Sequence, residues 1–88
     1  MGMEMKITWK GHPEIYYMFA RQIGPHRKVD GKWNVPVRVS MCFAEGTEVL
    51  DMVGDYNFVA ESDEDITYPN IYKYLHSLDE FLEAKAVL

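Results

Sequence analysis

The sequence predicts one small α+β domain, in which an antiparallel sheet is covered by helices. Apolar and polar residues alternate from Val35 to Phe43, a pattern typical of a strand with one buried face. After Pro69, apolar residues recur at the three- and four-residue spacing of an amphipathic helix. Residues 1–88 are expected to form a single domain, because a chain of 88 residues supports one modest core.

The N-terminal quarter contains one predicted strand and one segment that fits two structures. Residues 4–9 alternate between apolar and polar, which predicts a short strand at an edge of the sheet. Residues 13–23 begin with proline and end before a Gly-Pro pair, which are helix start and stop signals. Ile15, Phe19 and Ile23 recur every four residues, which also favours a helix. An Ile-Tyr-Tyr run within the segment favours a strand, so the preferred helix has a strand as its alternative.

The middle of the chain is predicted to be a three-stranded antiparallel meander. Residues 24–34 form a basic loop, and their Asp30-Gly31 pair is typical of a turn. Strands are expected at residues 35–43, 47–53 and 56–60, separated by turns at Glu45-Gly46 and Gly54-Asp55. Strands joined by such short turns pair as antiparallel neighbours.

The C-terminal segment is predicted to be a helix near residues 69–86. Its apolar stripe consists of Ile71, Leu75, Leu78 and Leu82. Ser77-Leu-Asp-Glu80 matches a capping box, which indicates that the helix can restart at Ser77. The expected order is therefore β-α-β-β-β-α, with helices on one face of the sheet and the other face open to water or to a partner.

Charge is unevenly distributed between the two halves of the chain. Residues 1–40 contain seven Lys or Arg and three acids, whereas residues 41–88 contain two Lys and eleven acids, for a net charge of −5. Such asymmetry favours a partner of complementary charge. The alternative without a binding role is that the two halves pack together and the charges are simply solvated.

No residue pattern indicates catalysis or metal binding. The three histidines are far apart in the sequence, and none has a second ligand at the spacing of a metal site. The glycines form no phosphate-binding loop, and Cys42 lies in a predicted strand without a base beside it. We therefore expect a protein that is not an enzyme and that needs neither a metal nor another cofactor.

The cysteine count and the absence of long apolar runs predict a reducing compartment without membrane contact. One cysteine allows no intrachain disulfide, which fits a reducing environment. No apolar run approaches the 18 residues or more of a membrane helix, and no secretory segment opens the chain. The expectation is a cytoplasmic protein without membrane contact.

The preferred functional hypothesis is a small acidic inhibitor or adaptor that docks on a basic protein, such as one that handles nucleic acid. Carboxylates would present charge as phosphates do, and tyrosines would serve as anchors. The candidate partner-binding residues are Glu45, Glu48, Asp51, Asp55, Glu61, Asp63, Glu64, Asp65, Tyr68 and Tyr72. In size and charge alone, the chain resembles small phage-encoded inhibitors of host defence, including anti-CRISPR proteins.

The alternative hypothesis is a nucleic-acid-binding domain that uses the basic segment at residues 21–32. Its candidate residues are Arg21, Arg27, Lys28, Lys32 and Trp33. Cations beside an aromatic ring can hold phosphates and stack bases. The α-β-β-β-α portion resembles the layout of double-stranded-RNA-binding domains, although acids rather than lysines precede the last helix. A homo-oligomer is also possible, because the second face of the meander carries Leu50, Met52 and Val59.

Overall fold

The structure, a computed structural model, describes residues 1–87 and confirms the α+β class. Its antiparallel sheet consists of β1 (Gly2–Trp9), β2 (His12–Gln22), β3 (Arg27–Val29), β4 (Lys32–Cys42), β5 (Val49–Ala60) and β6 (Lys85–Val87). The helical elements are the 3-10 turn η1 (Asp63–Asp65), the helix α1 (Tyr68–His76) and the 3-10 turn η2 (Asp79–Phe81). Neighbouring strands follow the order β5-β4-β2-β1-β6, and β3 pairs with β4 beyond the end of β2.

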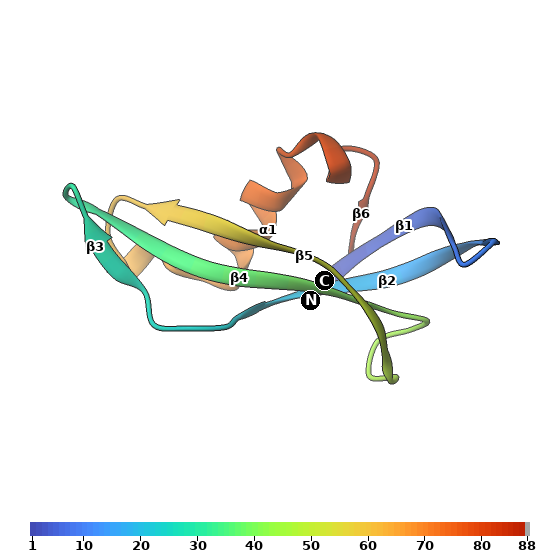
Figure 1. Ribbon diagram of the computed structural model, residues 1–88. Coiled ribbons are helices and arrows are strands. Elements are labelled where there is room, and N and C mark those ends of the chain that lie inside the picture. Colours follow the sequence, from blue (N-terminus) through green and yellow to red (C-terminus); the bar gives the residue numbers. More distant parts are fainter. Residues whose placement is uncertain (88) are drawn as a thin grey trace.

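Two hairpins make the molecule elongated, with extents of 44 × 21 × 21 Å. They project from opposite ends of the sheet, while α1 and η2 gather on one side of it (Figure 1). The β1–β2 hairpin turns at Lys10-Gly11, and the β3–β4 hairpin turns at Asp30-Gly31, the one of these two turns that the sequence predicted. All four residues have positive φ, as a two-residue type I′ turn requires. Arg27, Lys28 and Lys32 therefore lie on the hairpin at one end of the molecule, and the turn at Lys10-Gly11 lies at the other end.

The core lies between the sheet and α1. Alternate residues of β2 and β4 face the helix, including Tyr16 and Val37, which are fully buried. The helix contributes Ile71 and Leu75, and η2 contributes Phe81. The buried cluster consists of Met3, Tyr16, Met18, Ala20, Val35, Val37, Val39, Met41, Phe58, Ala60, Ile71, Tyr72, Leu75 and Phe81.

The preferred prediction of a helix at residues 13–23 is wrong, because this segment is the strand β2. A spacing of four residues, as between Ile15 and Phe19, places side chains on one face of a strand as well as of a helix. The core-facing phase is the other one, and it includes Tyr16 and Met18. Strand-favouring residues and pairing with both β1 and β4 outweigh the start and stop signals. Without this helix, the layout of a double-stranded-RNA-binding domain is absent as well.

The predicted strands at residues 47–53 and 56–60 are a single strand, β5, and the predicted turn at Gly54 lies inside it. Two register shifts against β4 leave Leu50 and Val53 without partners. These β-bulges bend the strand and break the simple alternation that the prediction relied on. Leu50 consequently packs against the core and not on the open face of the sheet.

The C-terminal helix is shorter than predicted. It begins at Tyr68, where Thr67 Oγ1 accepts a hydrogen bond from the N–H of Asn70 at 3.3 Å. It ends at His76, and the Ser77 hydroxyl donates to a carbonyl of the last turn. The chain then forms η2 and returns to the sheet as β6, so the residues up to 86 do not continue the helix.

Two smaller predictions also change. β1 is only partly an edge strand, because β6 pairs with Gly2–Glu4 and leaves Met5–Trp9 open on that side. The predicted loop at residues 24–34 contains the short strand β3 and the beginning of β4. The basic residues of this segment are therefore held on a hairpin rather than on an irregular loop.

Candidate functional site

A pocket of about 510 Å³ lies where α1, the first residue and the β4–β5 turn meet β2. The side chains that shape it are Met1, Tyr17, Phe19, Glu45, Tyr68 and Tyr72, and we call it the tyrosine pocket. Glu45, Tyr68 and Tyr72 are three of the predicted partner-binding residues. They come from the β4–β5 turn and from α1, so the fold brings together residues that are distant in the sequence.

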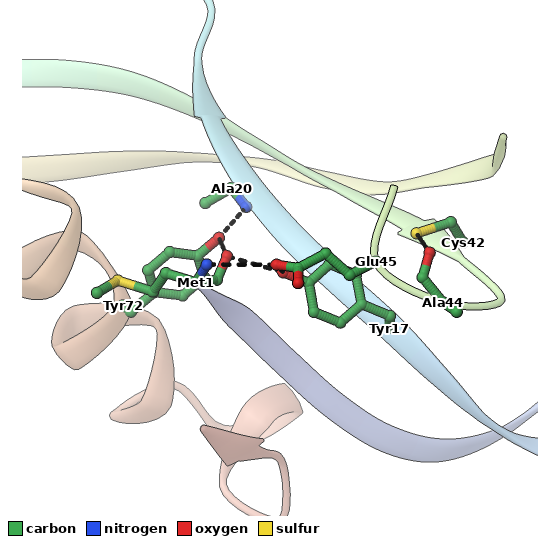
Figure 2. A network of polar contacts seen from close by, with 7 residues as sticks. All are labelled: Met1, Tyr17, Ala20, Cys42, Ala44, Glu45 and Tyr72. Carbon is green, nitrogen blue, oxygen red and sulfur yellow. Dashed lines mark hydrogen bonds and ion pairs between the residues drawn. The ribbon is translucent and has the colours of Figure 1, made fainter. Parts of the chain in front are cut away.

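The tyrosine pocket forms because β2 extends beyond its partner β1. Their pairing ends with Met3 opposite Met18, so the N–H of Ala20 has no strand partner on that side. Tyr72 Oη accepts a hydrogen bond from this N–H at 2.7 Å (Figure 2). The helix thereby satisfies a buried backbone donor that the sheet leaves unpaired, and the Tyr72 ring becomes part of the pocket wall.

A polar network joins the β4–β5 turn to the first residue (Figure 2). Tyr17 Oη lies 3.0 Å from Glu45 Oε2 and 2.9 Å from the carbonyl oxygen of Met1. Tyr72 Oη lies 3.2 Å from the same carbonyl, and the Met1 amino nitrogen lies 3.5 Å from Glu45 Oε2. Because a hydroxyl has one proton, Tyr17 donates to one of its two acceptors at a time, and a hydrogen bond from Tyr72 to the Met1 carbonyl leaves the Tyr17 proton for Glu45. The carboxylate of Glu45 is thus oriented by a buried tyrosine.

Gly2 is required for this placement of Tyr17. A Cβ at residue 2 would lie 2.7 Å from the carbonyl oxygen of Met18 and closer still to the Tyr17 hydroxyl. Real Cβ atoms do not approach other atoms so closely, and the Met18 carbonyl belongs to a paired strand that cannot easily move. Glycine at this position therefore allows β1 to lie directly against the tyrosine ring.

The hydroxyls of the network remain protonated at neutral pH. Burial raises the pKa of Tyr17, and its hydrogen bond to the Glu45 carboxylate raises that pKa further. Burial also raises the pKa of Tyr72. Both side chains therefore act as hydrogen-bond donors across the physiological range.

The rim of the tyrosine pocket is accessible, whereas its inner rings are buried. Tyr68 is 46% exposed, and the side chain of Glu45 is 64% exposed. Phe19 is half-buried and stacks on Tyr17, with ring centroids 6.4 Å apart and an interplanar angle of 26°. The site therefore combines fixed inner rings with an aromatic and acidic rim that a ligand can reach.

The two predicted acidic residues that lie within β5, Asp51 and Asp55, are held by side chains of other strands. Trp9 Nε1 donates to Asp51 Oδ2 at 3.0 Å, and Arg38 Nε donates to Asp55 Oδ1 at 2.8 Å. These hydrogen bonds lower the pKa of both carboxyl groups. The first bond also links β1 to β5, which β2 and β4 separate in the sheet.

The other predicted acidic residues lie at two ends of β5. Glu48 is exposed in the β4–β5 turn, whereas Asp63–Asp65 form η1, beyond the far end of the strand. Glu61 lies beside η1 and pairs with Lys32, with 3.4 Å between Oε1 and Nζ. The acidic series is therefore divided along the length of β5, and Glu45 is its one member that lines the tyrosine pocket.

Most of the predicted basic patch lies on the β3–β4 hairpin. Its exposed cations there are Arg27, Lys28 and Lys32. The ring of Trp33 meets His26 edge-on at 5.1 Å, and Lys28 Nζ lies 6.0 Å from the Trp33 ring centroid. Arg21 is separate from this group, because it lies on β2. Four of the five predicted residues are thus brought together.

Sequence reasoning missed Tyr17 and Phe19 as site residues. Both were placed in the predicted helix, where their separation of two residues would point them in different directions. In a strand the same separation places them on one face, next to each other. Ile15, Tyr17 and Phe19 are spaced two residues apart, which is the period of a strand. This spacing was the available signal, and the helix prediction did not use it.

Among residues 1–87, no group of three or more His, Cys, Asp or Glu is arranged to hold a metal ion. Cys42 is buried, and its Sγ donates to the Ala44 carbonyl at 3.1 Å. Thr47 Oγ1 donates to the same carbonyl, so neither side chain faces a base. No helix in this part of the chain has the length and apolar character needed to cross a bilayer.

The raised tyrosine pKa values predict a loss of stability in alkali. Burial and a hydrogen bond to Glu80 raise the pKa of Tyr56 to about 12, and that of Tyr17 is also raised. Such a group binds its proton more tightly in the folded state. Its stabilising contribution is complete below the unfolded pKa of about 10 and is lost as the pH rises toward the folded value. Urea unfolding measured at about pH 8, 10 and 11 should show the free energy of unfolding decreasing as the pH rises.

The variant Tyr56→Phe checks the cause of this fall. Phenylalanine keeps the ring but removes the ionisable hydroxyl, so the free energy of unfolding should decline less steeply above pH 10 than in the wild type. An equally steep decline in the variant would assign the alkaline loss to other groups.

Comparison with known proteins does not assign the chain to a family: no family model matches it, and no curated protein or solved structure is significantly similar to it.

Proposed function

We propose that this protein is a non-enzymatic binding module, a small inhibitor or adaptor that docks on the basic surface of another protein in the cytoplasm. The observation that supports this proposal is the convergence of Glu45, Tyr68 and Tyr72 around one open pocket. Tyrosine anchors in a pocket are typical of the centres of protein interfaces. The exposed carboxylate favours a partner that presents a cation there.

The positions of the acidic residues favour a local contact over mimicry of nucleic acid. A mimic of nucleic acid needs a row of carboxylates on one surface, whereas most of the acidic residues here lie beyond the two ends of β5, and only Asp51 and Asp55 lie within it. Asp51 and Asp55 are also engaged by Trp9 and Arg38. The proposal therefore depends on a local contact at Glu45 and the tyrosines rather than on a long acidic track.

Affinity capture from source cells tests this proposal. The immobilised wild type should retain a defined protein, identified by mass spectrometry, that Tyr68→Ala and Glu45→Lys retain at least about tenfold less. Glu83→Lys is the matched control, because it reverses the charge of an exposed acid outside the pocket. Capture that is equal for all four proteins would overturn the proposal.

Nucleic-acid binding is the second candidate, and the surroundings of Trp33 favour it. Lys28 and His26 flank this ring on an exposed hairpin, an arrangement that can hold a stacked base and its phosphate. The acidic residues 61–65 lie beside the same hairpin and would repel phosphates. RNA or DNA that copurifies at moderate salt, and that Arg27→Glu releases, would support this candidate over the first.

A further inference from the structure

We propose that the tyrosine pocket binds an arginine side chain of the partner, with the guanidinium group against Glu45 and the aromatic rings around it. This inference rests on the proposed function, and it specifies which chemical group the pocket recognises. The argument uses the charge of the pocket, the faces of its rings and the position of its carboxylate.

Two charged groups border the pocket: the carboxylate of Glu45 and the amino group of Met1, which lies 3.5 Å from Glu45 Oε2. Among residues 1–87, its lining includes no lysine, arginine or histidine. Glu45 Oε2 accepts from Tyr17, whereas Oε1 accepts no hydrogen bond from this part of the chain. One carboxylate oxygen is thus left for an incoming donor, and the side chain is exposed enough for that donor to reach it.

The aromatic rings of the pocket also differ from the two tryptophan rings in having no lysine of the described chain over their faces. Lys10 Nζ lies 4.9 Å from the Trp9 ring centroid, and Lys28 Nζ lies 6.0 Å from that of Trp33. Within residues 1–87, no lysine or arginine lies over a ring of the tyrosine pocket. The negative ring faces of Phe19 and Tyr68 are therefore available to a cation supplied by another molecule.

Arginine fits this arrangement better than lysine does. A guanidinium is planar and weakly hydrated, so it can stack on a ring while it donates to a carboxylate. An ammonium is compact and strongly hydrated, which makes its transfer into an apolar pocket more costly. Phe19 and Tyr68 provide the ring faces, and Glu45 provides the acceptor at the rim.

The acceptor is held in place before any ligand arrives. Tyr17 donates to Glu45 at 3.0 Å, and its own ring is buried against Phe19 and Gly2. A side chain that is already oriented loses less conformational freedom on binding, so more of the contact energy appears as affinity. At about 510 Å³, the pocket has room for an arginine side chain with part of its neighbouring backbone.

Titration of the full chain with small probes, followed by amide chemical shifts in NMR, tests the inference. N-acetyl-arginine amide should bind weakly, with a Kd of order 1 mM, and should shift residues of the pocket. The equivalent lysine probe should bind at least about threefold less tightly, and the uncharged citrulline probe should give no saturable shifts. Arginine binding no tighter than that of lysine or citrulline would overturn the inference.

Variants locate the contact. Glu45→Gln should weaken arginine binding at least about fivefold, because its amide still accepts from Tyr17 but carries no charge. Tyr68→Ala should weaken it through the loss of a ring face, whereas Glu83→Gln should leave it unchanged. Equal affinity in Glu45→Gln and the wild type would contradict the assigned site.

These outcomes separate the inference from the proposed function. Partner capture that depends on Tyr68 and Glu45, without arginine binding, would reject arginine as the recognised group but would still support the docking site. Capture that is indifferent to both substitutions would reject the docking site, whatever the small probes do.

Discussion

Replacing Phe81 with alanine is expected to lower the free energy of unfolding by about 3–5 kcal/mol. Phe81 is fully buried in η2, and its ring meets that of Tyr56 with 5.6 Å between centroids. Alanine would leave a cavity that the surrounding side chains can fill only in part. A chain of this length has a total stability of roughly 4–13 kcal/mol, so the loss should be evident as a much lower urea midpoint.

Leu82→Ala is the matched control for this substitution. Leu82 is adjacent in the sequence and is also a large apolar residue, but it is 62% exposed. Its truncation should change the free energy of unfolding by no more than about 0.5 kcal/mol. Equal losses in the Phe81 and Leu82 variants would contradict the arrangement of η2 against the sheet.

The same pair of residues explains why the sequence predicted only part of the C-terminal core. The helical period through Ile71 and Leu75 was correct, and both residues are buried. Extended by two turns, that period also predicts a buried Leu82. A period applies only while the helix continues, and this helix ends at His76. Beyond that point Phe81 takes the buried position.

The end of the helix at Ser77 could not be recognised from local sequence. Ser-Leu-Asp-Glu fits the start of a helix, in which serine accepts from a later N–H. In the structure the Ser77 hydroxyl donates backward to the Tyr74 carbonyl at 2.5 Å, and Leu78 is the residue before η2. A serine can make either hydrogen bond, so the packing of the segment that follows decides between them.

The strands show the same division between local and distant information. The alternation from Val35 to Phe43 predicted β4 well, because one face of that strand is buried along its length. For β2, the four-residue spacing of Ile15 and Phe19 fitted both structures, and the decision depended on pairing with two other strands. Such pairing joins residues far apart in the chain, which a local pattern does not record.

The candidate site was predicted in its residue types but not in its location. Tyrosine enrichment and acidic charge identified Glu45, Tyr68 and Tyr72. Their convergence depends on α1 packing at the free edge of β2, including a contact between Tyr72 and Met1 across 71 positions of sequence. The acidic residues are equivalent in the sequence but differ in their surroundings in the structure. Asp51 and Asp55 bond to Trp9 and Arg38, whereas Glu45 lines the tyrosine pocket.

Replacing Tyr72 with phenylalanine is expected to cost about 1–3 kcal/mol, although it removes a single oxygen. The hydroxyl accepts from the N–H of Ala20 at 2.7 Å, and the variant would leave that buried donor without a partner. Tyr74→Phe is the matched control on the same helix. Among residues 1–87, the Tyr74 hydroxyl makes no hydrogen bond and is not buried without a partner, so its loss should change the urea midpoint very little.

The Tyr72 hydroxyl also connects stability to binding. It donates to the Met1 carbonyl at 3.2 Å, which leaves the proton of Tyr17 for Glu45. Without it, Tyr17 is the one tyrosine hydroxyl left beside that carbonyl, at 2.9 Å, and a proton donated there is lost from the hydrogen bond that orients Glu45. Tyr72→Phe should therefore weaken arginine binding as well as stability, whereas Tyr74→Phe should change neither. A less stable Tyr72→Phe protein with unchanged arginine affinity would show that this network does not position the carboxylate.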